Sequence, residues 1–187
     1  MQVICDVDKH ITAFHVRCPG SRTDSAVYKR MALYQKPLEH FSPGEYILAD
    51  SAYMLSRTCI PAYKAPAANH PENMDFNYCL TKARVRNEHC IGILKSRWGS
   101  LREMRNQIRS ATDMLTFVNW VIVCCVLHNM LAHLGDAWAE LYLEEDMADN
   151  VGFDGGGEAV LLDAETFRET LKRTTIETNY MQGILPR

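Results

Sequence analysis

The amino-acid sequence predicts a fold of the α/β class, in which short strands alternate with helices. Three observations support this prediction. Short apolar runs separated by turn residues occupy the first third of the chain, a helical period begins near Leu80, and a nearly continuous apolar stretch follows Ser110. The 187 residues, of which 47% are hydrophobic and 23% charged, are sufficient for one packed soluble domain.

The N-terminal segment is predicted to be a β-hairpin followed by a helix. Gln2–Cys5 and Ile11–Val16 are partly alternating apolar runs, and polar turn residues join them. Thr23 or Asp24 then has the side chain to cap a helix that reaches about Leu33.

Two further strands are predicted in the next part of the chain. Tyr46–Ala49 is apolar, lies between turn signals and stops at Asp50, as expected for a buried parallel strand. Ile60–Tyr63 is a second short strand, and its Pro61 favours a sheet edge. Residues 64–74 are rich in Pro, Ala and Asn and are expected to form a loop.

A helix is predicted from about Leu80 to Glu103. One face of it is apolar, and beside that face lies a stripe that includes Glu88, so this carboxylate borders the buried surface. The apolar face consists of Ile91, Leu94, Trp98 and Leu101, and the stripe of Arg84, Glu88, Gly92 and Lys95.

The C-terminal half is predicted to contain two more helices. Ser110 to Asp113 resembles a capping box, and the apolar helix after it, to about Leu134, is expected to lie in the core. His128 on this helix is interpreted as a core histidine with satisfied hydrogen bonds rather than as a metal ligand, and Trp98 and Trp120 as packed side chains. Asp163 is expected to cap a final amphipathic helix that reaches about Tyr180.

Charge is distributed unevenly along the chain. The segment Asp136–Glu158 contains eight acidic and no basic residues, whereas Lys82–Arg109 contains eight basic residues against Glu88 and Glu103. Clustered Lys and Arg side chains suit a polyanionic partner, and the alternative is an ordinary solvated helix face.

Cysteine content and hydropathy indicate the compartment. The seven cysteines include no CxxC pair, which favours a reducing environment over a disulfide framework. The most apolar run, Phe117–Leu127, is too short to span a bilayer. We therefore expect a soluble intracellular protein that does not contact a membrane.

Three carboxylates have positions that suit metal-dependent chemistry. Asp24 follows a Pro-Gly turn, Asp50 ends the predicted buried strand, and Glu88 borders the buried face of a helix. Phosphodiester cleavage by two metal ions needs carboxylates that converge on the ions. The alternative is that Asp50 is a turn or cap residue, as an aspartate after a strand commonly is.

A set of short motifs gives these carboxylates a context. Pro19-Gly-Ser-Arg-Thr-Asp-Ser25, Leu48-Ala-Asp-Ser-Ala-Tyr53 and Pro61-Ala-Tyr-Lys64 resemble, in order, three motifs of PIF/Harbinger transposases and their domesticated relatives. The block from Phe76-Asn77 through Arg84, Glu88 and Gly92 to Lys95 resembles the segment that carries the catalytic glutamate of that family. Val126-Leu-His-Asn129 is similar to a signature near the end of its nuclease domain. The resemblance covers residues 2 to 133.

The resemblance implies a fold and a set of site residues. It implies the ribonuclease-H-like core of DDE integrases and transposases, a mixed sheet flanked by helices. Asp50 and Glu88 would be catalytic, and with Asp24 they would bind Mg²⁺ or Mn²⁺. Candidates for contact with DNA phosphates are Lys82, Arg84, Arg86, Lys95 and Arg97.

The chain departs from the family pattern at its start. The first catalytic aspartate of the family lies upstream of the first strand seen here, so we expect the first central strand to be missing. Asp6 and Asp8 do not replace it, because they lie in the hairpin turn. The hairpin and the Tyr46–Ala49 strand then cannot pair directly, and each is expected to expose an edge.

The expected organisation is a partial endonuclease domain over residues 1–135, an acidic linker over 136–160, and a C-terminal amphipathic helix and tail over 161–187. The resemblance implies metal-dependent cleavage of DNA in a full-length parent. The alternative is a non-catalytic, domesticated or decayed product that binds DNA or protein. Expected partners are DNA and either a separate Myb-like DNA-binding protein or further copies of the chain, and the expected location is the nucleus.

Overall fold

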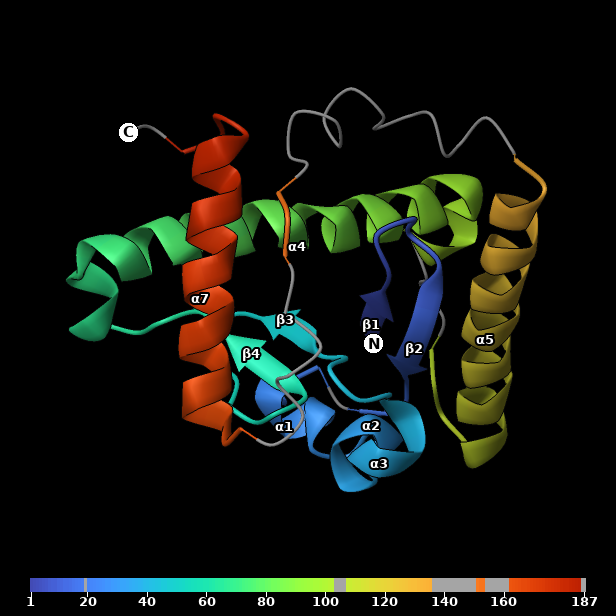
Figure 1. Ribbon diagram of the computed structural model, residues 1–187. Coiled ribbons are helices and arrows are strands. Elements are labelled where there is room, and N and C mark those ends of the chain that lie inside the picture. The colour runs from blue at the N-terminus through green and yellow to red at the C-terminus, as the bar shows by residue number, and fades with distance from the viewer. Residues whose placement is uncertain (19, 103–106, 136–150, 154–161, 186–187) are drawn as a thin grey trace. The chain divides into compact units, whose positions relative to one another are not determined.

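The fold was analysed in a computed structural model, which describes residues 1–18, 20–102, 107–135, 151–153 and 162–185. The chain divides into two compact units (Figure 1). The first unit combines Met1–Arg22 with Val85–Ala148, and the second combines Thr23–Arg84 with Asp149–Arg187. The boundary falls within one long helix, α4, which contributes its N-terminal part to the second unit and its C-terminal part to the first.

Among its described residues, the first unit contains a β-hairpin, two α-helices and a short 3-10 helix. Strands β1 (Gln2–Cys5) and β2 (Ile11–His15) pair antiparallel, as predicted, with an irregularity between Ile4 and Cys5. The C-terminal part of α4 (Pro71–Arg97), the short 3-10 helix η2 (Gly99–Leu101) and α5 (Ala111–His133) complete the unit. Its core consists of Val3, Ile11, Cys90, Leu94, Val121, Cys124 and Cys125.

The second unit contains a parallel strand pair and several helices. Strands β3 (Ile47–Ala49) and β4 (Cys59–Pro61) pair in parallel, and Leu48 lies opposite Ile60. The helices are α1 (Asp24–Tyr28), α2 (Ala32–Gln35), α3 (Pro37–His40), η1 (Ala67–Asn69), the N-terminal part of α4, and α7 (Ala164–Met181).

The α/β class and the predicted strands are therefore confirmed. Within the described residues, the hairpin and the parallel pair form two separate two-stranded sheets. The ribonuclease-H-like strand order, which would join them in one mixed sheet, stays a prediction.

Two predicted helix boundaries were wrong. The helix expected from Leu80 begins at Pro71, because proline is favoured in the first turn and Phe76 and Leu80, one turn apart, supply a fully buried face. The helix expected to reach Leu33 ends at Tyr28, and two short helices follow it. Thr23 is its N-cap, and its hydroxyl accepts a hydrogen bond from the backbone N–H of Ala26 at 3.4 Å.

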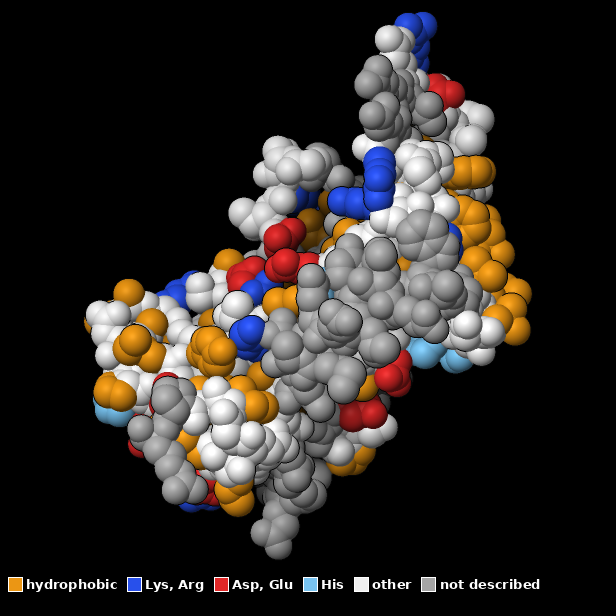
Figure 2. Space-filling model, turned by 90° about the horizontal axis from the view of Figure 1, so that it is seen from above, with side chains coloured by type: hydrophobic (Ala, Val, Ile, Leu, Met, Phe, Trp, Pro, Cys, Tyr) orange, Lys and Arg blue, Asp and Glu red, His pale blue; other side chains and the backbone are white. Residues whose placement is uncertain are grey.

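The predicted core helix α5 is buried on one face and exposed on the other. Val121 and Cys125 lie in the core, whereas Trp120, Val126 and Met130 are about half exposed, and Figure 2 shows hydrophobic side chains gathered at the edge where α5 lies. The prediction that Trp120 packs in the core was wrong, because its indole N–H instead donates to Ser100 Oγ at 3.1 Å. Trp98 does pack against the core.

The length and composition of α5 would also allow it to cross a membrane. The helix has 23 residues and is thus longer than the apolar run Phe117–Leu127 within it, which by itself was predicted to be too short to span a bilayer. The same length and hydropathy occur in helices of soluble proteins, and the buried face of α5 packs in the core of the first unit.

The start of α5 is a capping box, as predicted. Ser110 Oγ accepts a hydrogen bond from the N–H of Asp113 at 3.1 Å, and Asp113 Oδ2 accepts from the N–H groups of Arg109 and Ser110 at 3.0 and 2.9 Å. The bonds from Arg109 and then Ser110 lower the pKa of the Asp113 carboxyl below its ordinary value.

The capping box predicts a pH-dependent contribution to thermal stability. Because the pKa of Asp113 is lower in the folded protein, its contribution is present well above pH 3.8 and is lost as the pH falls through the folded pKa. We expect Asp113→Ala to lower the melting temperature at pH 7, and the difference from the parent to shrink toward pH 3. Asp113→Asn, which keeps an acceptor oxygen, is the control and should lose less at pH 7.

Helix α7 packs within the core of the second unit. Asp163 caps it, as predicted, and accepts hydrogen bonds from the N–H groups of Glu165 and Thr166. Phe167 and Leu171 on α7 are completely or almost completely buried. They join a cluster that also contains Ile60, Tyr63, Phe76 and Leu80. The compact units therefore follow boundaries other than 1–135, 136–160 and 161–187; that division stays a prediction, and most of 136–160 lies outside the described residues.

Asparagine side chains hold the strands and loops of both units to their helices. The amide of Asn129 on α5 accepts from the N–H of Ile11 at 2.8 Å and donates to its carbonyl at 2.9 Å. Asn77 on α4 makes the same two bonds with Tyr63, at 2.8 and 3.1 Å. Each amide therefore makes the two backbone hydrogen bonds that a neighbouring strand would make to that residue. Both motif asparagines thus have a structural role.

His128 is a core residue, as predicted. Its Nδ1 accepts a hydrogen bond from Arg97 Nη1 at 3.1 Å, since a guanidinium can only donate. Nε2 therefore carries the proton and donates to the carbonyl of Lys9 at 3.1 Å. The side chain thus links α4, α5 and the hairpin turn, and both of its ring nitrogens are satisfied.

Candidate metal centre

Asp50 lies directly after strand β3, at the carboxyl end of the parallel pair. Its Oδ1 accepts a hydrogen bond from the backbone N–H of Ala52 at 2.7 Å, and its carbonyl accepts from Tyr53 at 3.2 Å. The alternative interpretation of Asp50 as a turn residue is therefore confirmed for one carboxylate oxygen. The other oxygen, Oδ2, faces the guanidinium of Arg84, with 4.0 Å between Oδ2 and Nη2.

Asp24 lies in the same unit, at the first position of α1. Its backbone follows the Thr23 cap, and its side chain is exposed. A carboxylate in the first turn of a helix is favoured by the helix dipole, so the position has a structural explanation as well.

The charges of both aspartates affect the phenol of Tyr53. Burial raises the pKa of its phenol above the ordinary range, and the negative charges of Asp24 and Asp50 raise it further, whereas Arg84 lowers it. All four side chains belong to the second unit, so both carboxylates and the guanidinium act on one phenol. We call Asp24, Asp50, Tyr53 and Arg84 the Asp50 cluster.

Glu88 belongs to the first unit. It is exposed on α4, and its neighbours His89 and Cys90 are buried. The prediction that it joins Asp24 and Asp50 around metal ions stays a prediction, because the two aspartates lie in the other unit.

The predicted DNA-contacting residues lie along α4 in different surroundings. Lys95 is exposed, and Lys82 Nζ lies 5.9 Å from the centre of the Tyr78 ring. Arg97 donates to the ring and the carbonyl of His128, which gives it a structural role in the first unit. Arg84 faces Asp50, and Arg86 is half-buried. Contact of any of these residues with DNA stays a prediction.

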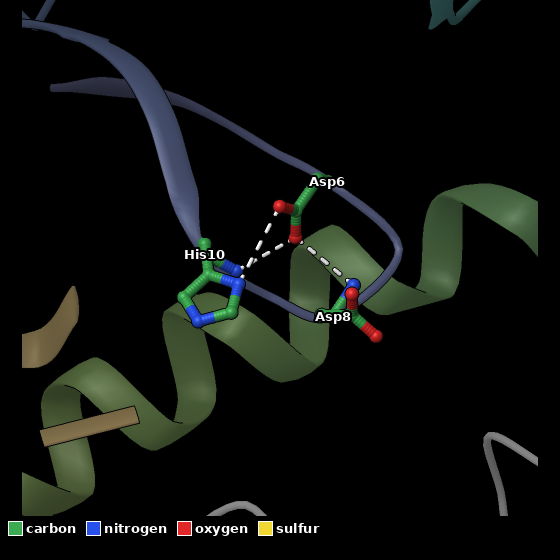
Figure 3. Close-up of side chains that lie close together, drawn as sticks. All are labelled: Asp6, Asp8 and His10. Carbon is green, nitrogen blue, oxygen red and sulfur yellow. Dashed lines mark hydrogen bonds and ion pairs between the residues drawn. The ribbon is translucent and has the colours of Figure 1, made fainter. Parts of the chain in front are cut away.

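A second group of potential ligands lies in the hairpin turn (Figure 3). One ligand atom from each of Asp6, Asp8 and His10 lies within 4.8 Å of the others, and no other such group of three occurs among the described His, Cys, Asp and Glu residues. Asp6 Oδ1 accepts from the N–H groups of Asp8 and His10, both at 2.9 Å. Asp6 thus stabilises the turn, which confirms the predicted turn role.

The Asp50 cluster has donor groups that suit a divalent cation. Carboxylate oxygens are the preferred protein ligands of Mg²⁺ and Mn²⁺, and Asp50 Oδ2 and the exposed Asp24 carboxylate supply them. Their combined charge exceeds that of Arg84 by one. The described cleft of about 490 Å³ lies elsewhere in the second unit, along α7 and Glu72, and none of the candidate carboxylates lines it.

Sequence reasoning identified both aspartates but missed two members of the cluster. Tyr53 follows Asp50 by three residues within the same motif. This spacing across a turn could have indicated that Tyr53 lies near Asp50. Arg84 was assigned to DNA alone, and no sequence pattern indicates that it faces Asp50, because 34 residues separate them.

Comparison with known proteins agrees with these motifs. A family model described as DDE superfamily endonuclease matches residues 1–129, which include every candidate site residue. A protein of Arabidopsis thaliana named "Protein ALP1-like" is 25% identical over 149 residues, which are 73% of this chain. The chain spans only 36% of the length of that relative. No solved structure matches this chain. Because the family model covers more than half of the chain, the protein belongs to the DDE superfamily endonuclease family.

Proposed function

We propose that the chain is part of a Harbinger-type DDE endonuclease that cleaves DNA phosphodiester bonds with the help of divalent metal ions. The observation that carries this proposal is the Asp50 cluster. Asp50 faces Arg84 at the carboxyl end of a parallel strand pair, and Asp24 begins a helix of the same unit, both within the residues that match the family.

The proposal assigns Glu88 to the same site. Arg84, which faces Asp50, and Glu88 are four residues apart in α4, a spacing that places side chains on one side of a helix.

The chemistry of the site follows from its charges. A bound Mg²⁺ or Mn²⁺ would neutralise the phosphate and activate water for attack on phosphorus. Asp24, Asp50 and Glu88 would hold the cation, and the basic residues of α4 would bind the phosphate backbone. The Ala52 N–H would orient Asp50 by its bond to Oδ1.

A second candidate function is a non-catalytic DNA- or protein-binding module. The observation that favours it is the pairing of Asp50, whose two oxygens already have the Ala52 N–H and the Arg84 guanidinium as neighbours. An arrangement of this kind is stable without a metal ion. In either case we propose DNA as the partner and the nucleus as the location, with a Myb-like protein or further copies of the chain as additional partners.

Calorimetric titration with Mn²⁺ tests the metal site. We expect the parent chain to bind Mn²⁺, and Asp50→Asn and Asp24→Asn each to weaken binding at least tenfold, about 1.4 kcal/mol, because each removes a charged ligand. Glu39→Gln, at a carboxylate in α3 that pairs with Lys36, is the control and should bind as the parent does. Circular dichroism of each variant verifies that it is folded.

A third variant separates the Asp50 cluster from the hairpin turn. Asp8→Asn removes an exposed carboxylate of the turn group and leaves the bonds of Asp6 to the backbone in place. If Asp8→Asn abolishes Mn²⁺ binding and Asp50→Asn does not, the metal binds in the turn and the proposed site is wrong. If the folded parent binds no Mn²⁺, the non-catalytic module is the better description.

A further inference from the structure

We propose that Arg84 and a divalent cation compete for Asp50 Oδ2, so that metal binding releases the Arg84 guanidinium to a DNA phosphate. Arg84 would then be a positioning residue that couples the metal site to DNA. The inference rests on the proposed metal site and assigns to Arg84 a role that differs from permanent contact with DNA.

The hydrogen bonds of Asp50 indicate for which of its two oxygens a metal ion and Arg84 would compete. Oδ1 is occupied by the Ala52 N–H at 2.7 Å, an interaction that also forms the turn after β3. Oδ2 is the oxygen left for a cation from outside, and it is the one that faces Arg84 Nη2. A metal ion and the guanidinium therefore need the same atom.

The strength of the ion pair allows exchange. The distance between Nη2 and Oδ2 is 4.0 Å, longer than the 2.7–2.9 Å of a direct charge-assisted hydrogen bond. The side chains of Arg84 and Asp50 are 35% and 38% exposed, so water screens their attraction. A weak, solvent-accessible pair of this kind yields to a divalent cation, whose charge is twice that of the guanidinium.

The charges around the pair favour the exchange. Asp24 and Asp50 carry two negative charges, and Arg84 supplies one positive charge, as their opposite effects on the pKa of Tyr53 also indicate. A divalent cation would neutralise both carboxylates, after which the guanidinium would be repelled by the ion and would lack its partner. A phosphate diester offers two non-bridging oxygens, which the planar guanidinium can bind with two parallel hydrogen bonds.

The first test is the Mn²⁺ affinity of variants at position 84. We expect Arg84→Gln to bind Mn²⁺ about three- to tenfold more tightly than the parent, because the competing charge is removed. Arg84→Lys, which keeps the charge, should stay closer to the parent. Arg86→Gln removes the same charge two residues along α4 and should change the affinity less than twofold.

The second test is binding to a short DNA duplex, measured by fluorescence anisotropy with and without metal. In EDTA, Arg84→Gln should bind as the parent does, since Asp50 holds the guanidinium. With Ca²⁺, used as a metal that occupies carboxylate sites, Arg84→Gln should bind more weakly than the parent. The slope of log affinity against log salt should then fall by about one.

The possible outcomes separate this inference from the proposed function. If Asp50→Asn abolishes Mn²⁺ binding but Arg84→Gln leaves the affinity unchanged or weaker, the metal site stands and the competition is wrong. If Arg84→Gln weakens DNA binding equally in EDTA and in Ca²⁺, Arg84 contacts DNA permanently and the release is wrong. A folded parent that binds no Mn²⁺ overturns both proposals.

Discussion

Leu171→Ala is expected to lower the free energy of unfolding of the second unit by about 3–5 kcal/mol. Leu171 is completely buried in the cluster that α7 forms with Ile60, Tyr63, Phe76 and Leu80, so truncation removes its contacts and leaves a cavity. Urea denaturation followed by circular dichroism measures the loss. Hydrogen exchange of the α7 amides assigns it to the second unit.

The matched control is Leu38→Ala on α3. This leucine belongs to the same unit and is 96% exposed, so the same chemical change should cost less than about 0.5 kcal/mol. Equal effects of the two substitutions would contradict the packing of α7 described above.

This prediction concerns more than stability. The family model ends at residue 129, whereas α7 lies beyond it and completes the core behind β3 and β4. Since Asp50 directly follows β3, the geometry of the Asp50 cluster depends on a helix outside the matched segment. We therefore expect Leu171→Ala to weaken Mn²⁺ binding as well, although α7 supplies no proposed ligand.

Asn129→Asp is expected to destabilise the first unit by about 2–4 kcal/mol, although the two side chains have nearly the same shape. The asparagine Nδ2 donates to the carbonyl of Ile11 at 2.9 Å, and an aspartate would place a second acceptor oxygen there. The substitution therefore replaces a hydrogen bond by a repulsive contact and brings a charge to a partly buried position. Urea denaturation followed by the fluorescence of Trp98 and Trp120 measures the loss.

Asn119→Asp is the matched control for this substitution. Asn119 lies on the same helix, ten residues earlier, and is exposed, so its change should alter stability by less than about 0.5 kcal/mol. If both variants have the stability of the parent, Asn129 does not hold strand β2 to α5.

How much of the fold could be predicted depends on how far apart in the sequence the residues that determine each element lie. The hairpin, the capping box at Ser110 and the Asp163 cap were predicted correctly, because each rests on residues within a few positions of one another. The start of α4 at Pro71 was missed, since a segment rich in Pro, Ala and Asn has loop composition until its buried face is known. The exposed face of α5 was missed because an apolar pattern does not reveal how much surface its neighbours cover.

The candidate site shows the same division. Sequence motifs identified Asp24, Asp50 and Glu88, because the residue types and their order match a family. The partners of these carboxylates were not predicted. Arg97 donates to His128 and Arg84 faces Asp50, whereas contact of either residue with DNA stays a prediction.

The sequence by itself determined the α/β class, the family and the carboxylates proposed to hold a metal ion, since these follow from local patterns and motif order. The tertiary structure alone decided that Asn77 and Asn129 act as substitutes for strands, that α7 belongs to the core, and that Arg84 faces Asp50. The physical reason is that hydrogen bonds, burial and ion pairs depend on distances between residues that are remote in sequence, and no local pattern encodes those distances.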